Sequence, residues 1–348
     1  MPELRKDPIS ARWVVVSTER GQRPSDFKGV SVPALTETYS PKCPFCQGNE
    51  KTTPPEIMAW RKDKKTKPDT PGWEVRVCDN KFPALTKSGE VNRTGVGIFD
   101  MMTGIGAHEV MVENPIHNLT LSDMSVENIE HLLWAYRERL VELSKDSRFR
   151  YILIFKNYGA AGGASLEHSH SQLIATPITP RYVKMELSAA REYFLKKERC
   201  IFCDLMRQEL SSGERLVYEN EFFVAFTPFA SRFPFEIWIL PRRHHFSFND
   251  LPEAEKKQLA VCLKDILMRL KLVLKDPAYN YVLHTAPNAL PRPGKPDYWG
   301  TLPFDFHWHI EIIPRLTKQA GFEWGSGLYI NPTPPEEAAK HLRNANIS

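Results

Sequence analysis

The sequence predicts an α+β fold built from two similar halves, residues 1–180 and 181–348. Three observations predict it: the chain contains two CxxC pairs, each half ends in a His-x-His, and the same order of strand-like and helical segments lies between them. A length of 348 residues suits one or two domains, and 42% hydrophobic and 25% charged residues are typical of globular proteins. We expect the halves to pair pseudo-symmetrically, with their strands in one antiparallel sheet or two abutting sheets and helices flanking them.

The first part of the repeat runs from each CxxC pair to a single histidine. The pairs are Cys43/Cys46 and Cys200/Cys203, followed by Asp79-Asn80-Lys81-Phe82 and Glu219-Asn220-Glu221-Phe222. The apolar runs 108–112 and 235–240 then predict strands, which lead to His117 and His244. Six residues after each histidine stands an aspartate, Asp123 or Asp250, which we expect to cap the following helix.

The second part of the repeat is a helix, a strand and the His-x-His. Apolar residues recur at spacings of three and four over 126–140 and 259–274, which predicts two helices with core-facing stripes. The β-rich runs 151–155 and 281–283 follow, and the halves close on His168-Ser169-His170 and His307-Trp308-His309.

The cysteines indicate metal binding. Zinc takes four nitrogen or sulfur ligands, so each CxxC supplies half a site and histidines should supply the rest, whereas a thioredoxin-like redox motif would not explain two pairs. We therefore expect two zinc sites that staple the fold. Their ligands are Cys43, Cys46, His117 and His168 in the first half, and Cys200, Cys203, His244 and His307 in the second.

Composition also narrows the class of partner. No apolar run approaches the 18 residues of a membrane span, and the N-terminus lacks the apolar region of a signal peptide, so we expect a cytoplasmic protein without membrane contact. A net charge of +4 with scattered Lys and Arg argues against a nucleic-acid binder, including a twin zinc-ribbon module. A mildly basic chain suits small anionic substrates.

Residues 157–172 carry the chemistry that we expect. A strand leads into a loop rich in Gly and Ala, whose N–H groups can hold phosphate oxygens, and the chain returns as a second strand. Because side chains alternate along a strand, His168, His170 and Gln172 share one face. A metal ligand, a free imidazole and a neutral amide would thus lie side by side beneath a phosphate-sized loop.

These residues resemble the active site of the histidine-triad superfamily, in its transferase branch, the galactose-1-phosphate uridylyltransferase family. The similarity runs along nearly the whole chain and implies a doubled histidine-triad-like fold and a homodimer. It includes Arg5-Lys6-Asp7-Pro8, Arg20-Gly21-Gln22-Arg23-Pro24, the first CxxC, Asn80-Lys81-Phe82-Pro83-Ala84-Leu85, residues 157–172 and Phe306-His307-Trp308-His309.

The resemblance implies a ping-pong transfer in which His170 attacks the α-phosphorus of a nucleotide sugar and releases a sugar 1-phosphate. A second sugar 1-phosphate then takes the nucleotide. Gln172, Ser165 and loop amides would stabilise the phosphate charge. Gln172 stands where histidine-triad hydrolases have a third histidine, and an amide cannot exchange protons, which disfavours hydrolysis. The second half, with His309 and Glu311 at the matching positions, is expected to be structural and to bind the sugar.

The resemblance also assigns substrate contacts and leaves alternatives open. Nucleotide and phosphates would be bound by Arg20, Arg23, Asn80, Asn157 and Gly163, and sugar hydroxyls by Glu323. The leading prediction is exchange of UMP between UDP-glucose and galactose 1-phosphate. Residues 324–332 look more like ADP-glucose phosphorylases, which makes an AMP-histidine and a phosphate acceptor the alternative. The second metal could also be iron, and its ligands could instead be Glu186, His284, His307 and His309.

Overall fold

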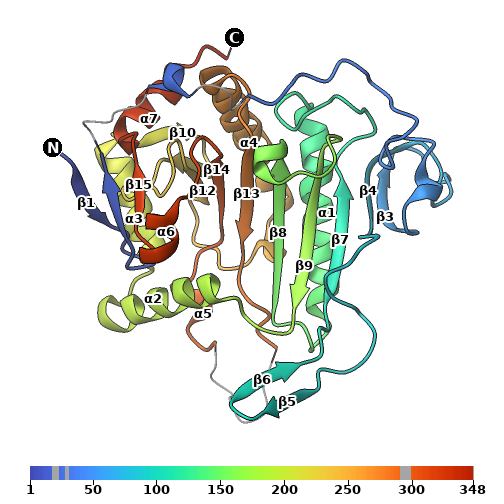
Figure 1. Ribbon diagram of the computed structural model, residues 1–348, viewed down its shortest axis with the longest axis horizontal. Helices are drawn as coiled ribbons and strands as arrows, with labels where there is room; N and C mark the ends of the chain where they lie inside the picture. The colour runs from blue at the N-terminus through green and yellow to red at the C-terminus, as the bar shows by residue number, and fades with distance from the viewer. Residues whose placement is uncertain (18–22, 28–30, 291–298, 348) are drawn as a thin grey trace.

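The computed structural model describes residues 1–17, 23–27, 31–290 and 299–347. Its centre is one ten-stranded antiparallel sheet with the order β10-β11-β12-β14-β13-β8-β9-β7-β4-β3 (Figure 1). The strands are β3 (Glu56–Arg61), β4 (Trp73–Asp79), β7 (Ala107–Val112), β8 (Tyr151–Tyr158), β9 (His170–Thr176), β10 (Leu216–Glu219), β11 (Phe223–Phe226), β12 (Ile237–Pro241), β13 (Tyr279–His284) and β14 (His309–Pro314). The predicted antiparallel α+β fold is confirmed, and the two halves share one sheet rather than two.

The strand order repeats about the middle of the sheet. The first half contributes β3-β4-β7-β9-β8, the second contributes β10-β11-β12-β14-β13 in the matching order, and β8 pairs with β13. Across this central pair Lys156 is opposite Tyr281, and Leu283 is opposite Ile154. Lys156 corresponds to Leu283 and Ile154 corresponds to Tyr281 in the two halves, so the two pairs exchange with each other and the register itself obeys the pseudo-two-fold relation.

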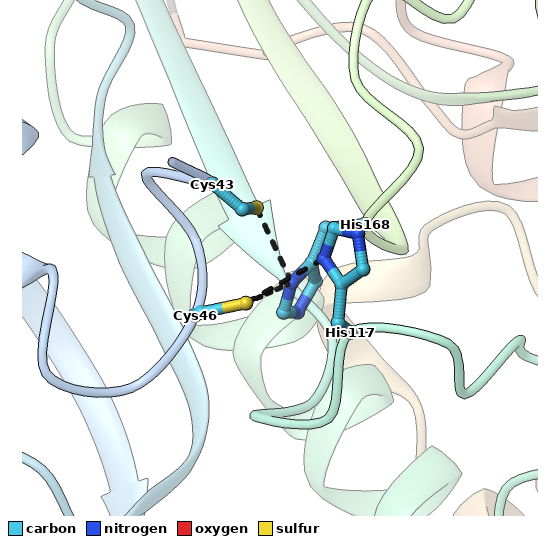
Figure 2. A group of neighbouring side chains, drawn as sticks. All are labelled: Cys43, Cys46, His117 and His168. Atoms are coloured by element: carbon cyan, nitrogen blue, oxygen red, sulfur yellow. Dashed lines mark hydrogen bonds between the residues drawn. The ribbon is translucent and has the colours of Figure 1, made fainter. Parts of the chain in front are cut away.

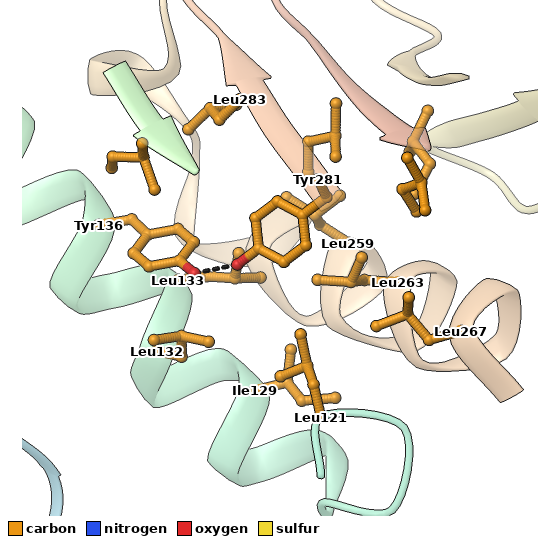
Figure 3. Close-up of a cluster of buried hydrophobic side chains, with 14 of the residues drawn as sticks. Leu121, Ile129, Leu132, Leu133, Tyr136, Leu259, Leu263, Leu267, Tyr281 and Leu283 are labelled. Atoms are coloured by element: carbon orange, nitrogen blue, oxygen red, sulfur yellow. Dashed lines mark hydrogen bonds between the residues drawn. The ribbon is translucent and has the colours of Figure 1, made fainter. Parts of the chain in front are cut away.

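Helices cover both faces of the sheet because the strand residues alternate. One face carries α1 (Val126–Ser144) and α4 (Glu253–Leu274), which pack against each other and lie beside Leu283 (Figure 3). Ile154 belongs to the same buried cluster. The opposite face contacts α2 (Arg181–Lys197) and α3 (Ile201–Ser212). Strand residues buried under these helices belong to the core, so only the other strand residues can line a site.

The expected aspartate caps are wrong. Helix α1 is capped by Ser125, whose hydroxyl accepts the Asn128 N–H at 3.1 Å, and α4 begins after Pro252. Asp123 instead pairs with Lys271 at 2.7 Å. A serine three residues before a free amide satisfies the first helical turn directly, which leaves the aspartate for an ion pair with the other half.

The chain ends form a smaller sheet. Strands β1 (Glu3–Lys6) and β2 (Trp13–Val16) pair with each other, and β15 (Tyr329–Asn331) adds parallel to β2. Nearby lie α6 (Gly321–Ser326) and α7 (Pro335–Arg343), whereas α5 (Leu302–Asp305) packs against α2 (Figure 1). Strands β5 (Arg93–Val96) and β6 (Phe99–Met102) form a projecting hairpin (Figure 1). Among the described helices, none has the length and hydropathy of a bilayer span.

Candidate active site and metal centres

The predicted catalytic strand borders a cavity of about 600 Å³. Strand β8 leads into the short helix η4 (Ala160–Gly162), and the chain returns as β9. Four of the residues predicted to act on substrate line this cavity: His170, Gln172, Ser165 and Asn80. The remaining lining includes Thr52, Thr53 and Pro54, which no sequence motif singled out.

His170 has the geometry of a neutral nucleophile. Its Nδ1 lies 2.8 Å from the carbonyl oxygen of His168, so the Nδ1–H donates there and the lone pair is on Nε2. Burial lowers the pKa of His170, and the positive charge of Lys156 lowers it further. The hydrogen bond to the His168 carbonyl raises the pKa but does not offset the burial. The ring is therefore unprotonated at pH 7, as an attacking imidazole must be.

Gln172 is oriented by His108, a residue that the sequence reasoning missed. The backbone N–H of Ala84 donates to His108 Nδ1 at 3.2 Å, so the ring proton resides on Nε2. That Nε2–H faces the Oε1 atom of Gln172 at 2.8 Å. The amide NH₂ of Gln172 is then the end left to donate to a bound phosphate. The alternation of side chains along strand β7 could have identified His108, because His108 and Val110 share a face and Val110 is opposite Gln172.

The glycine loop packs closely against the second half. A Cβ atom on Gly162 would lie 2.8 Å from the carbonyl oxygen of Tyr279, and Gly159 and Gly163 have φ of 73° and 86°. Asn280 Nδ2 donates to the Gly162 carbonyl at 2.6 Å and to Asn157 Oδ1 at 2.8 Å. Asn157 and Gly163 thus help to hold the loop in its conformation.

Two of the remaining predicted contacts, Arg23 and Glu323, are not brought to this cavity. Arg20 lies outside the described residues. Arg23 opens the turn η2 (Pro24–Asp26), where its N–H donates to Asp26 at 2.8 Å. Glu323 caps α6 by accepting the Ala320 N–H at 2.9 Å, and α6 lies beside β15, away from β9 (Figure 1). Among the described residues of the cavity lining, neither Arg23 nor Glu323 appears.

The first Cys/His group is assembled as expected (Figure 2). Cys46 Sγ lies 3.5 Å from His117 Nδ1 and 3.6 Å from His168 Nδ1, Cys43 Sγ is 3.6 Å from His168 Nδ1, and the four ligand atoms lie within 4.8 Å of one another. His168 Nε2 donates to the Asn114 carbonyl at 2.7 Å, which leaves Nδ1 facing the thiols. Burial lowers the pKa of His168 to about 4, so the ring is neutral. Two thiols and two imidazole nitrogens at these distances fit a tetrahedral metal ion.

The second Cys/His group has the same design. Cys203 Sγ is 3.4 Å from His244 Nδ1 and 3.5 Å from His307 Nδ1, with Cys200 completing the four ligands. His244 Nε2 faces the Pro303 carbonyl at 2.9 Å, which supplies the outer hydrogen bond that ligating histidines usually make. These residues can hold a second metal ion.

The alternative ligand set for the second metal is not brought together as a whole. His307 points to the cysteines, whereas Glu186, His284 and His309 form a separate group. Within it, His284 Nδ1 donates to Glu186 Oε2 at 3.0 Å.

His309, the counterpart of His170, is enclosed. Its Nδ1 donates to the His307 carbonyl at 3.1 Å, as in the first half. Its ring, however, is stacked between Trp238 and His284, with centroid distances of 5.1 and 4.5 Å. The adjacent Glu311 is paired with Arg232. His309 is therefore packed among side chains, whereas His170 borders a cavity.

Two matching half-sheets with a single open His-x-His-x-Gln strand define a class of enzyme, the nucleotidyltransferases with a doubled fold. Residues 1–180 match the family model described as galactose-1-phosphate uridyl transferase, N-terminal domain, and residues 186–342 match that of the C-terminal domain. The chain belongs to the galactose-1-phosphate uridylyltransferase family, and the predicted resemblance is confirmed.

Relatives cover the full length of the chain. ADP-glucose phosphorylase of Arabidopsis thaliana is 37% identical over 100% of this chain and 94% of its own length. Galactose-1-phosphate uridylyltransferase of Thermotoga maritima is 32% identical over 100% of this chain and 99% of its own. The crystal structure of the Arabidopsis phosphorylase with bound ADP-glucose matches with a TM-score of 0.81, 34% identity and full coverage of both chains. A uridylyltransferase structure matches with a TM-score of 0.72 and 30% identity over 99% of this chain and 97% of that one.

Proposed function

We propose that the protein transfers a nucleotide from a nucleoside-diphosphate hexose through a covalent nucleotidyl-His170 intermediate. The observation that carries the proposal is the hydrogen bond from His170 Nδ1 to the His168 carbonyl, which leaves the Nε2 lone pair available at the cavity. Membership of the family supports the same chemistry.

In the first step Nε2 of His170 forms a bond to the α-phosphorus, and the bond from that phosphorus to the bridging oxygen breaks. The leaving sugar 1-phosphate departs as an anion and needs no proton. The imidazolium keeps its Nδ1–H on the His168 carbonyl. In the second step an oxygen of the phosphate acceptor attacks phosphorus and restores the imidazole, so no general base is required. Donors from Gln172, Ser165 and the loop amides stabilise the charge on the non-bridging oxygens.

We propose ADP-glucose as the donor and inorganic phosphate as the acceptor. The greater similarity to the phosphorylase supports this choice, with 37% against 32% identity and TM-scores of 0.81 against 0.72. The second candidate is exchange of UMP between UDP-glucose and galactose 1-phosphate, which the family models and the Thermotoga relative favour.

We also propose that zinc occupies both Cys/His groups, with iron as the alternative in the second. When bound, zinc would clamp the CxxC segment to the end of the catalytic strand. His168 would both ligate the ion and hold His170 through its carbonyl, so the metal would act on the strand and not on the substrate. Free thiols of this kind favour a reducing compartment, and we place the enzyme in the cytoplasm. The predicted homodimer would allow Arg23 and Glu323 to reach a substrate bound by a second copy.

Intact-protein mass at neutral pH tests the proposal, after incubation with ADP-glucose or UDP-glucose without acceptor. We expect an AMP-sized adduct from ADP-glucose that is lost on adding phosphate and is absent in His170→Ala. His309→Ala is the matched control and should keep the adduct. A UMP-sized adduct alone would select the second candidate. The absence of any adduct in a protein with both metals bound would refute the covalent mechanism.

A further inference from the structure

A buried ion pair lies behind the catalytic strand, on the face opposite the cavity. Lys156 Nζ donates to Glu113 Oε2 at 2.6 Å, to Ser169 Oγ at 2.9 Å and to the His170 carbonyl at 3.2 Å. Ser169 Oγ in turn donates to Glu113 Oε2 at 2.5 Å. The side chains of Lys156 and Glu113 are 1% and 0% exposed. The proposed transfer assigns no chemistry to these charges.

The second half provides an internal comparison for this ion pair. In the strand register Lys156 is opposite Ser171, and at the corresponding place Leu283 is opposite Ile310. Two residues before Ser171 and Ile310 stand Ser169 and Trp308, so Trp308 takes the position of Ser169. Met111 and Ile239 also correspond in the register, so Pro241 takes the position of Glu113. All four counterparts are buried and apolar: Leu283, Ile310, Trp308 and Pro241.

The fold therefore does not need charges at this place. Removing two charges from water is costly, and replacing a buried ion pair with well-packed apolar residues is often neutral or stabilising. The two pseudo-equivalent strands differ in what they carry: β9 carries the open His170, whereas β14 carries the enclosed His309. The charged arrangement occurs behind the strand with the open histidine, which associates it with the reaction.

We propose that Lys156 is a positioning residue whose ammonium group, held by Glu113, fixes the backbone of residues 168–170 so that His170 presents Nε2 for in-line attack. Its hydrogen bond to the His170 carbonyl holds the peptide unit that follows the imidazole, and its hydrogen bond to the Ser169 hydroxyl holds the side chain of the residue before it. The His168 carbonyl, which accepts the His170 Nδ1–H, belongs to the same short segment. This inference rests on the proposed nucleotidyl transfer.

The test measures the single-turnover rate of nucleotidyl-enzyme formation from ADP-glucose, the nucleotide Kd, the metal content and the melting temperature. The variants are Lys156→Met, which leaves the Glu113 carboxylate alone, and Lys156→Met/Glu113→Leu, which removes both charges as in the second half. Leu283→Met is the matched control at the pseudo-equivalent position. We expect both Lys156 variants to lose about tenfold to hundredfold in rate, as misplaced reacting groups do, with little change in Kd or metal content.

The double variant separates positioning from stability. We expect it to melt above the single variant, because no unpaired charge remains, while its rate stays low. Wild-type rates in either folded variant would overturn the inference, as would a rate loss that follows the loss of metal or of nucleotide binding. Failure of the double variant to fold would also overturn it, because the pair would then be a requirement of the fold. If the wild-type protein itself forms no adduct, the proposed function fails instead.

Discussion

His108 offers a sharp test of how the site is organised, because its Nε2 atom lies 2.8 Å from Gln172 Oε1 and 3.1 Å from Asn80 Nδ2, and both partners line the cavity. His108→Phe removes the donor that holds Gln172 Oε1 at 2.8 Å. One such hydrogen bond is worth about 1 kcal/mol, which is roughly a fivefold bias toward the amide orientation with NH₂ in the cavity. Without this bias the two orientations become about equal, and ring replacement also disturbs the contact with Ala84. We expect a loss of roughly twofold to tenfold in the rate of adduct formation.

A double-mutant cycle then decides whether the effect passes through Gln172. Removing an oxyanion donor outright costs about 10²–10³-fold, so Gln172→Ala should be much slower than His108→Phe. In the Gln172→Ala background the His108 substitution should have a much smaller effect, because only its contacts with Ala84 and Asn80 remain to be lost. His108→Gln, which can still donate, should recover part of the rate. Fully additive losses in single-turnover measurements would refute the assignment.

Three further substitutions probe the metal, the loop and the docking of the N-terminal strand. Cys46→Ser should lose the metal of the first group, keep that of the second and lower the melting temperature; unchanged metal analysis would contradict the ligand set. Gly162→Ala brings a Cβ within 2.8 Å of the Tyr279 carbonyl oxygen, so both adduct formation and thermal stability should fall. Burial raises the pKa of Glu336, but hydrogen bonds from Arg5 and a second arginine lower it below the ordinary 4.5. Glu336→Gln should therefore reduce the melting temperature by a few degrees at pH 7, and the difference from wild type should close as the pH falls below about 4.5, toward the depressed pKa. A difference that persists at low pH would contradict this ion pair.

The repeat was predictable because short segments of the sequence carry its patterns. CxxC pairs, the spacing to each histidine and the apolar periods of two helices are properties of short segments, and they gave the halves and the antiparallel α+β class. The pairing of β8 with β13 has no such local signature, so one sheet and two abutting sheets were equally compatible with the sequence. The helix caps failed for a related reason: Ser125 and Asp123 are both good caps by residue type, and the cross-half pair with Lys271 decides between them.

The site was predicted unevenly. His170 and Gln172 stand on one short strand, where the period of two fixes their face. His108 comes from a neighbouring strand, and its relation to Gln172 depends on a register that only the folded sheet defines. Lys156 and Glu113 are charged residues within apolar runs, and their burial follows from the packing of α1 over that face. Arg23 and Glu323 lie outside the cavity of their own chain, and in the proposed homodimer they would act on a substrate bound by the second copy.

The duplicated fold carries two His-x-His motifs, and their neighbours distinguish them. Val110 lines the cavity opposite Gln172, whereas Trp238 occupies the same register position opposite Glu311 and stacks on His309. A tryptophan in the place of a valine covers the His309 ring, whereas His170 borders a cavity. Glu311 also puts a carboxylate where the first half has an amide, and a carboxylate repels phosphate oxygens that Gln172 can bind. Substituting Trp238 alone would therefore uncover His309 without creating the phosphate site of the first half, because position 311 would still carry a carboxylate, paired with Arg232, in place of an amide.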